Sequence, residues 1–448
     1  MSRLAPLSGF PEWSPSERIV EAFVLDTLRD VFALHGFGEI ETRAVEPLDR
    51  LGGEAEASKA VYMLRRRGGE KFEFGLHFDL TVPFARYVEE RQGQLQFPFR
   101  RFQIQKVWRG ERPQEGRFRE FYQADIDVVA RENLPAHLEA EVAVVMARAL
   151  AALPLPAARM RMNDRRLVEG FYRGVGIEGV AAALRSVDKL GKIGPDGVAK
   201  ELEGQRVSDD AATAILELAK IQSPDSSFRE AVLDLWETTP THGDERAQAV
   251  LGEGLNALVA LIDSVNAAVP GTAMADLSIA RGLDYYTGAV YETTLDGHED
   301  LGSICSGGRY DSLVAGGGFP GVGMSIGVSR LVSRLVSREL LVATRSVPSA
   351  VLVAVIDEAN RPLSDSIAAR LRARGIACEV SPTAAKFGKQ IQYADRRGIP
   401  YVWFPGDGED GEVGVGQVKD IRSGDQVPAD ADAWMPPADD LRPRVVRG

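Results

Sequence analysis

Cysteine and histidine are scarce in this chain. Its 448 residues contain two cysteines, Cys305 and Cys378, and five histidines scattered along the sequence. Two cysteines so far apart argue against a disulfide framework and fit a reducing cytosol. The histidines and cysteines show no zinc-binding spacing, so we expect no metal site built from protein ligands.

Long apolar runs and an excess of positive charge are also missing. No apolar run is long enough to cross a bilayer, and the first residues, MSRLAPLSGFPEW, lack the apolar core of a signal peptide. The net charge is −12. This charge argues against non-specific coating of nucleic acid but allows a specific RNA bound at local basic patches. We therefore expect a cytoplasmic protein with no membrane or DNA partner.

The residues that are present predict a soluble protein of two or three domains. Hydrophobic residues make up 44% and charged residues 26% of the chain. The patterns predict a helix over 14–36, a short strand over 37–45, and an almost entirely helical stretch over 165–260. After Pro348, alternating strands and helices predict a small α/β domain with a largely parallel sheet. The tail from Asp430, which is rich in proline, is expected to be poorly ordered.

The stretch from 102 to 128 predicts two strands joined by a charged loop. Polar and apolar residues alternate on both sides of the loop, which gives each strand one polar face. In a hairpin this face would carry four polar side chains: Arg109, Glu111, Gln123 and Asp127. An ordinary hairpin facing water would show the same alternation. The loop, however, adds three arginines ahead of the aromatic ring of Phe121: Arg112, Arg117 and Arg119. Arginines beside an aromatic ring suit a triphosphate and a purine.

Two other segments place polar side chains at predicted strand ends. In FDLTVPFAR (78–86), Asp79 and Thr81 could bind a ligand's ammonium and hydroxyl groups, or could simply cap a turn or helix. In LSIARGLDYYTGAVYE (277–292), the hydroxyls of Tyr285 and Tyr286 could bond a polar ligand. A hairpin with two core tyrosines would explain those rings equally well, but it explains Arg281 poorly.

A glycine-dense run, GGGFPGVGMSIGVSRL (316–331), precedes a helix predicted over 325–335. It is not a Walker A loop, because no Gly-Lys-Ser/Thr follows. Glycine lets a backbone approach a ligand closely, and Arg330 beside such a wall could meet a phosphate. A surface arginine on an amphipathic helix is the equal alternative.

Taken together, these segments resemble the histidyl-tRNA synthetases, a family of class II aminoacyl-tRNA synthetases. The resemblance covers most of the chain. RGERPQEGRFREFYQ and GMSIGVSRL are similar to the second and third class II motifs. RGLDYYTG and SGGRYDSL are similar to two segments peculiar to the histidyl family, and FDLTVPFAR resembles its first histidine-contacting stretch.

The resemblance implies α/β and α+β architecture: an antiparallel sheet core with a helical insertion, followed by an α/β anticodon-binding domain. The implied boundaries are 1–163 and 261–345 for the two parts of the catalytic core, 164–260 for the insertion and 346–448 for the last domain. The implied activity is histidine–tRNA ligase, which joins L-histidine to tRNA(His) through a histidyl-adenylate. ATP is the implied co-substrate, with Mg²⁺, in a homodimer.

The resemblance also assigns roles to individual residues. Three would be catalytic: Arg109, Arg281 and Arg330. Five would bind ATP: Arg109, Glu111, Arg117, Phe121 and Arg330. Six would hold histidine: Asp79, Thr81, Gln123, Asp127, Tyr285 and Tyr286.

The chain departs from the family pattern at several positions. Arg43 stands where the first class II motif usually has proline, and Ser329 stands where the third commonly has glutamate. Asp79 and Asp127 are one methylene shorter than the glutamates of many bacterial members. A catalytically inactive, histidine-binding regulatory paralogue is the alternative, although such paralogues are expected to lack the last domain and to lose active-site residues.

Overall fold

The computed structural model describes residues 6–51, 60–69, 71–240, 244–280, 286–312, 314, 317–407 and 413–448. The chain divides into two compact units. The first contains Met1–Pro11 and Val24–Arg334, and the second contains Glu12–Phe23 and Leu335–Gly448. The long helix α1 (Pro15–Leu34) contributes to both.

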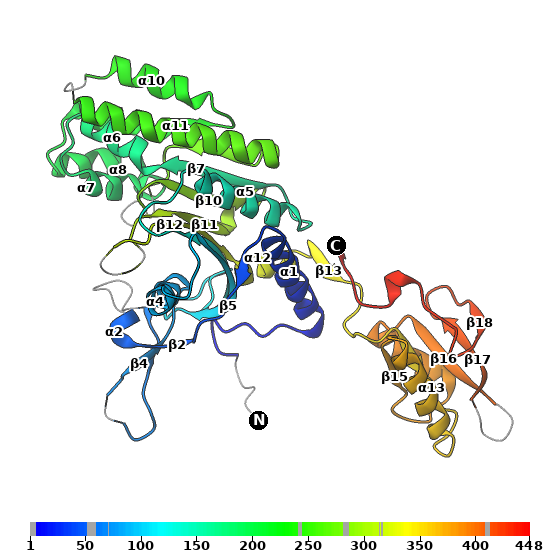
Figure 1. Cartoon of the computed structure of the whole chain (residues 1–448). Helices are drawn as coiled ribbons and strands as arrows, with labels where there is room; N and C mark the ends of the chain where they lie inside the picture. The colour runs from blue at the N-terminus through cyan, green and yellow to red at the C-terminus, as the bar shows by residue number, and fades with distance from the viewer. Residues whose placement is uncertain are drawn as a thin grey trace. The chain divides into compact units, whose positions relative to one another are not determined.

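The first unit is built on a nine-stranded sheet (Figure 1). The strands follow the order β1 (Gly38–Glu39), β5 (Phe99–Trp108), β6 (Glu120–Val129), β12 (Gly321–Gly327), β11 (Cys305–Tyr310), β10 (Ala289–Leu295), β7 (Ala158–Asp164), β9 (Ala273–Asp276) and β8 (Gln222–Ser223). From β5 to β7 every neighbouring pair is antiparallel. This confirms the expected antiparallel core.

The predicted hairpin is formed by β5 and β6, which pair from Phe99–Val129 to Trp108–Glu120 without a bulge. Residues with odd numbers pair with odd-numbered partners, as the alternation predicted. Arg109 and Glu111, which were expected on the face of the first strand, lie beyond its end at Trp108. The strand expected over 37–45 is shorter than predicted. Only β1 and the first residue of β2 (Val45–Pro47) fall within it. β2 joins β4 (Phe74–Leu76) and β3 (Met63–Leu64) in a separate small sheet.

Helices cover the sheet of the first unit and fill the predicted helical stretch. Those outside the stretch are α2 (Leu48–Leu51), α4 (Thr81–Arg91), α5 (His137–Ala151), the short η1 (Glu299–Leu301) and α12 (Val328–Ser337). Those within it are α6 (Arg165–Gly174), α7 (Val180–Val187), α8 (Leu190–Gly204), α9 (Asp209–Lys220), α10 (Phe228–Thr238) and α11 (Glu245–Ala268). Side-chain caps at Asp164, Ser208 and Asp244 satisfy the first amides of α6, α9 and α11. α12 starts at Val328 because residues 325–327 still belong to β12, so the predicted start was three residues early.

The expectation that no apolar run could span a bilayer needs correction at α11. Within the described part of the chain, this 24-residue helix is long and apolar enough to cross a membrane by length and composition alone. Its residues Leu251, Leu255, Leu258 and Ile262 are buried, and the helix packs on α5 and α6. Figure 1 shows it among the other helices of the first unit. This packing is that of a core helix.

The second unit carries a five-stranded sheet in the order β15 (Cys378–Val380), β14 (Val351–Val353), β16 (Tyr401–Asp407), β17 (Val413–Asp420) and β18 (Gln426–Ala429). α13 (Arg361–Ala373) and α14 (Phe387–Arg397) link the parallel strands β14, β15 and β16. β17 and β18 are antiparallel, so the sheet is mixed rather than largely parallel. Trp403 lies in the core, edge-on to Trp434.

The chain end is more ordered than predicted. After η3 (Ala438–Asp440), the strand β19 (Val445–Arg447) pairs with β13 (Leu341–Ala343). Hydrogen bonds between Thr344 and Arg444 extend this pairing. Three residues are too few for a sequence alternation to be recognised, which is why the prediction of a poorly ordered tail was wrong.

Candidate active site

A row of polar side chains crosses one face of the nine-stranded sheet. The strand registers pair Gln103 with Asp125, Asp125 with Ser325, Ser325 with Ser306, and Ser306 with Glu292. Residues paired across neighbouring strands point to the same face. Five consecutive strands therefore present polar groups along a single line.

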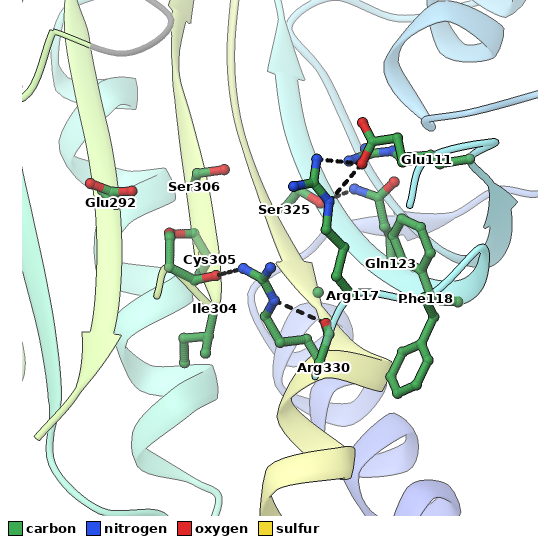
Figure 2. Close-up of a pocket in the computed structure, with 15 residues that line it drawn as sticks. Glu111, Arg117, Phe118, Gln123, Glu292, Ile304, Cys305, Ser306, Ser325 and Arg330 are labelled. Atoms are coloured by element: carbon green, nitrogen blue, oxygen red, sulfur yellow. Dashed lines mark hydrogen bonds and ion pairs between the residues drawn. The ribbon is translucent and has the colours of Figure 1, made fainter. Parts of the chain in front are cut away.

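A pocket of about 320 Å³ opens over this row (Figure 2). Five residues predicted to bind ATP line it: Arg109, Glu111, Arg117, Phe121 and Arg330. Gln123, which was predicted to hold histidine, lines it as well. Ser306, Ser325 and Glu292 form part of its wall. The structure thus brings together residues that are more than 200 positions apart in the sequence.

The loop of the hairpin supplies one side of the pocket. Arg117 Nε donates a hydrogen bond to Glu111 Oε2 (2.7 Å), and the two side chains form an ion pair. Arg109 Nε donates to the Phe78 carbonyl oxygen (2.8 Å), and its guanidinium lies 5.1 Å from the centre of the Phe121 ring. The backbone carbonyl and the ring fix the Arg109 guanidinium at the pocket wall.

Arg330 supplies the other side from the first turns of α12. Its Nε donates to the Gly116 carbonyl oxygen (3.1 Å) and its Nη1 donates to the Ser303 carbonyl oxygen (2.7 Å). Figure 2 shows these two bonds holding the guanidinium between the hairpin loop and the segment before β11. Neither carbonyl oxygen carries a full negative charge, so the guanidinium can still attract an anion.

A smaller cavity of about 40 Å³ adjoins the pocket and shares Ser306 and Ser325 with it. Five further side chains bring hydroxyl and carboxyl groups to it: Thr81, Asp125, Asp127, Tyr286 and Tyr310. Gln123 Nε2 donates to Ser325 Oγ (2.7 Å) at the junction of the two cavities. Among the described residues, Gln123 Oε1 and Asp125 Oδ1 are buried oxygens without a hydrogen-bond partner in the structure.

The inner cavity is surrounded by buried charges. Arg101 is fully buried and its Nη2 lies 2.6 Å from Asp127 Oδ2, while the Tyr310 hydroxyl donates to Asp127 Oδ1 (2.8 Å). Burial raises the pKa of Asp127 to about 6, although Arg101 acts in the opposite direction. Burial, aided by the charge of Asp127, raises the pKa of Asp125 to about 7. One guanidinium therefore serves two buried carboxyl groups.

Asp79 lies at the start of α4, as the capping alternative predicted. Its Oδ1 accepts a hydrogen bond from the Val82 amide (3.1 Å), and burial raises its pKa despite the nearby charges of Arg109 and Arg101. Capping and ligand binding are compatible, because a carboxylate has further acceptor positions. The pKa of Tyr286 is also raised, by burial and then by the charges of Asp127 and Asp125.

Two glycines make room for these side chains. A Cβ at Gly323 would overlap Asp127 Oδ1, and a Cβ at Gly308 would come within 2.6 Å of the Tyr286 ring. Both glycines occupy strands, where glycine usually weakens the sheet. Here the absence of a side chain at each glycine leaves space, and the side chains of Asp127 and Tyr286 occupy it.

Two predicted residues, Arg281 and Tyr285, lie outside the described part of the chain. Sequence reasoning did not single out five residues that surround the cavities: Arg101, Asp125, Ser306, Tyr310 and Ser325. Arg101 and Asp125 share the odd-numbered face of the hairpin with Asp127, and that parity could have identified them.

Two of the residues that depart from the family pattern, Ser329 and Arg43, have structural partners. The Ser329 hydroxyl accepts a hydrogen bond from the Tyr122 amide (2.9 Å) and so joins α12 to β6. Arg43 forms an ion pair with the buried carboxylate of Glu46 (3.1 Å).

Comparisons with known proteins identify a family for this chain. The family model described as histidyl-tRNA synthetase matches residues 9–331, and the model described as anticodon binding domain matches residues 350–435. A histidine–tRNA ligase from Cutibacterium acnes is 54% identical over 100% of this chain and 99% of its own length.

Solved structures give the same result. The histidyl-tRNA synthetase from Nostoc sp. PCC 7120 is 35% identical, has a TM-score of 0.84, and is matched over 96% of this chain and 98% of its own. A Bacillus halodurans protein described as an ATP phosphoribosyltransferase regulatory subunit/histidyl-tRNA synthetase shares only the fold. It is 18% identical, with a TM-score of 0.68 over 88% of this chain and 96% of its own. The family-model match over most of the length and the 54% identity over all of it lead to one conclusion: the chain belongs to the histidyl-tRNA synthetase family.

Proposed function

We propose that this chain is a histidine–tRNA ligase that activates L-histidine with ATP where its two cavities meet. One observation carries the proposal. An arginine-lined pocket, suited to polyphosphate, shares a wall with a cavity lined by buried carboxyl groups, suited to an ammonium. An amino acid must present its carboxylate to ATP while its ammonium is held, and adjoining sites of opposite charge provide that arrangement.

On the ATP side, arginines neutralise the charge that builds up in the reaction. The histidine carboxylate oxygen forms a bond to the α-phosphorus, and the bond from that phosphorus to the departing pyrophosphate breaks. Arg109 and Arg330 would contact the nucleotide phosphates from opposite walls, with Arg281 as a third cation. Positioning and charge neutralisation account for most of the rate in such a step.

The hairpin loop would place the rest of the nucleotide. Arg117 would reach the terminal phosphates, Phe121 would stack on the adenine ring, and Glu111 would accept hydrogen bonds beside it. Arg117 and Glu111 pair with each other in the structure. We propose that ATP binding breaks this pair, because Arg117 then binds the terminal phosphates and Glu111 binds beside the adenine ring.

On the histidine side, the carboxyl groups outnumber the cation. Asp79, Asp125 and Asp127 all feel the charge of Arg101, and Asp79 also feels that of Arg109. Three carboxyl groups thus face two guanidinium groups, so a substrate ammonium would complete the charge balance. Thr81 and Gln123 would add hydrogen bonds at the backbone end of the substrate. Tyr286, with Tyr285, would wall the imidazole, and the Tyr286 hydroxyl would bond one ring nitrogen.

Mg²⁺ would arrive with the nucleotide. Within the described residues, no cluster of three or more His, Cys, Asp or Glu side chains could hold a metal ion. The pocket does offer the carboxylates of Glu111 and Glu292, and Mg²⁺ commonly binds substrate phosphates plus one or two carboxylates. When bound, the ion neutralises charge on the leaving pyrophosphate.

The remaining parts of the proposal concern tRNA and assembly. The domain matched as anticodon-binding would bind tRNA(His), and the histidyl group would pass to the 3′ end of that tRNA. We propose a cytoplasmic homodimer, and we propose that the helical stretch 164–260 is an insertion in the catalytic core.

ATP–pyrophosphate exchange, with each amino acid supplied singly, tests the proposal. Exchange with histidine alone is the expected result. Histidine binding by calorimetry without any exchange would favour the regulatory paralogue instead. The Bacillus halodurans protein has the same fold, so the experiment must distinguish the ligase from a regulatory paralogue. The ligase is favoured by Arg109, by Arg330 and by the match to the anticodon-binding model.

A further inference from the structure

A basic turn projects from the small sheet of the first unit. β3 and β4 pair antiparallel, Met63 with Gly75 and Leu64 with Phe74. The residues between them begin with Arg65, Arg66 and Arg67, and the turn is closed by a hydrogen bond from the Gly69 amide to the Arg66 carbonyl oxygen (2.9 Å). Figure 1 shows this loop beyond β4, pointing away from the nine-stranded sheet. We call residues 63–69 and 71–76, the described part of this segment, the basic hairpin.

The charge of the basic hairpin contrasts with that of the whole chain. Residues 65–73 read RRRGGEKFE, four cations and two carboxylates, in a protein whose net charge is −12. The three arginines and Lys71 are exposed, and no ion pair joins any of them to a carboxylate of the described residues. The Arg65 guanidinium lies 5.4 Å from the centre of the half-exposed Phe72 ring. A flat cation supported by an aromatic ring and otherwise open to solvent suits a phosphate oxygen.

The base of the basic hairpin is fixed to the loop that lines the ATP pocket. The Gly110 amide donates to the Ala60 carbonyl oxygen (2.7 Å), directly after Arg109. At the other end of the hairpin, the buried His77 stacks on Trp108 (5.6 Å between ring centres) and its Nε2 donates to the Lys106 carbonyl oxygen (2.7 Å). The turn stands five or six residues beyond these attachments, which is about 17–20 Å in extended chain.

We propose that the basic hairpin binds backbone phosphates of the tRNA acceptor stem. This inference rests on the proposed function, because it requires that the tRNA 3′ end enters the pocket beside Arg109. The duplex that leads to that end must then pass within a few tens of ångströms of the pocket, the distance at which the turn stands. Arginine contacts to phosphates do not read sequence, so the hairpin acts as an electrostatic guide for any duplex that the active site accepts.

The test compares the variant R65A/R66A/R67A with R65K/R66K/R67K and the wild type, using a tRNA(His) transcript over a range of salt concentrations. We expect the alanine variant to lose at least tenfold in kcat/KM for tRNA at low salt, mainly through KM. Its plot of log kcat/KM against log salt should be less steep by about 0.7–0.9 for each phosphate that the arginines no longer neutralise. The lysine variant, which keeps the charge, should stay within about threefold of the wild type.

Histidine-dependent pyrophosphate exchange should be unchanged in both variants, since the hairpin touches neither cavity. Exchange that falls together with charging would overturn the proposal by showing that the hairpin supports the pocket. An unchanged tRNA KM and salt slope would also overturn it and show a solvated turn. Hydroxyl-radical footprinting locates the contact: protection in the acceptor stem that disappears in the alanine variant is expected, and a change elsewhere in the tRNA contradicts the assignment. Failure of the wild type to exchange with histidine would instead refute the proposed function.

Discussion

Arg101 and Asp127 form an ion pair in the interior of the first unit, 2.6 Å apart and directly opposite each other in the β5–β6 register. Asp125 lies two residues away on the same face and also feels the charge of Arg101. A buried carboxylate is costly unless a cation balances its charge, and Asp125 and Asp127 share the one charge of Arg101. Both carboxyl groups therefore stay protonated at pH values where a free aspartate is ionised. This relationship makes the inner cavity sensitive to pH.

Histidine binding should therefore strengthen as pH rises from about 5.5 to 7.5. Asp125 and Asp127 have raised pKa values of about 7 and 6, so both are largely protonated at the lower pH. A substrate ammonium favours their ionised forms, lowers their pKa values and releases protons. Isothermal titration calorimetry at pH 6.5, in buffers of different ionisation enthalpy, should show this release.

The control for that prediction is Asp125→Asn. The imidazole of free histidine titrates in the same pH range. Its titration affects binding to the wild type and to the variant equally, so it cancels when the two affinities are compared. The other charged or titratable groups around Asp125 stay in place in the variant: Asp79, Arg101, Asp127, Tyr286, Cys305 and Tyr310. We expect the variant to release fewer protons. Equal release by the two proteins would assign the protons to other groups.

The same substitution should change stability in a pH-dependent way. Because the pKa of Asp125 is about 7 in the folded chain and 3.8 is its ordinary value, the folded state holds this proton more tightly than the unfolded state. Its stabilising effect is complete below about pH 4 and is lost as pH rises through 7. Asp125→Asn should thus gain free energy of unfolding relative to the wild type at pH 8, by up to about 4 kcal/mol.

Thermal melts at pH 4.5 and pH 8 check this expectation. The difference between variant and wild type should be larger at pH 8. Asp263→Asn, which changes an exposed carboxylate on α11, should show no such change between the two pH values. A constant difference for Asp125→Asn would mean that the carboxyl group is ionised throughout.

The sequence predicted the strong periodic features and missed those that depend on distant partners. The alternation around Arg109 and Gln123 predicted the hairpin, and the family resemblance that rested on it is confirmed. Asp125 was passed over because burial depends on β12 and α4, whose residues arrive from elsewhere in the chain. β19 and the antiparallel strand β18 were missed for a similar reason: short strands are stabilised by pairing, which leaves little local pattern. The roles assigned to individual residues stay predictions.

Arg330→Ala should slow adenylate formation by about 100-fold or more, the usual effect of removing a preorganised charge from a reaction centre. Arg330→Lys should recover little of the lost rate. The planar guanidinium bonds the Gly116 and Ser303 carbonyls and still has donors for a phosphate, whereas a single ammonium cannot reach all three. Pre-steady-state adenylate formation measures both. Arg338→Ala, at an exposed site just after α12, is the matched control and should behave as the wild type. A modest loss in Arg330→Ala, below about fivefold, would remove Arg330 from the catalytic set.

Tyr286→Phe should raise the KM for histidine by about 5- to 30-fold, which corresponds to the 1–2 kcal/mol of one hydrogen bond to a polar ligand. The KM for ATP should not change, because Tyr286 lines only the inner cavity. The ring remains in place against Gly308, so the substitution removes the hydroxyl and little else.

Tyr291→Phe separates this effect from a general loss of stability. The Tyr291 hydroxyl donates to the Glu139 carbonyl oxygen (3.0 Å) on the side of β10 that faces α5, away from both cavities. Its removal should lower the melting temperature and leave the histidine KM unchanged. If Tyr286→Phe behaves in the same way, the ring of Tyr286 is a wall of the cavity and its hydroxyl takes no part in recognising the imidazole.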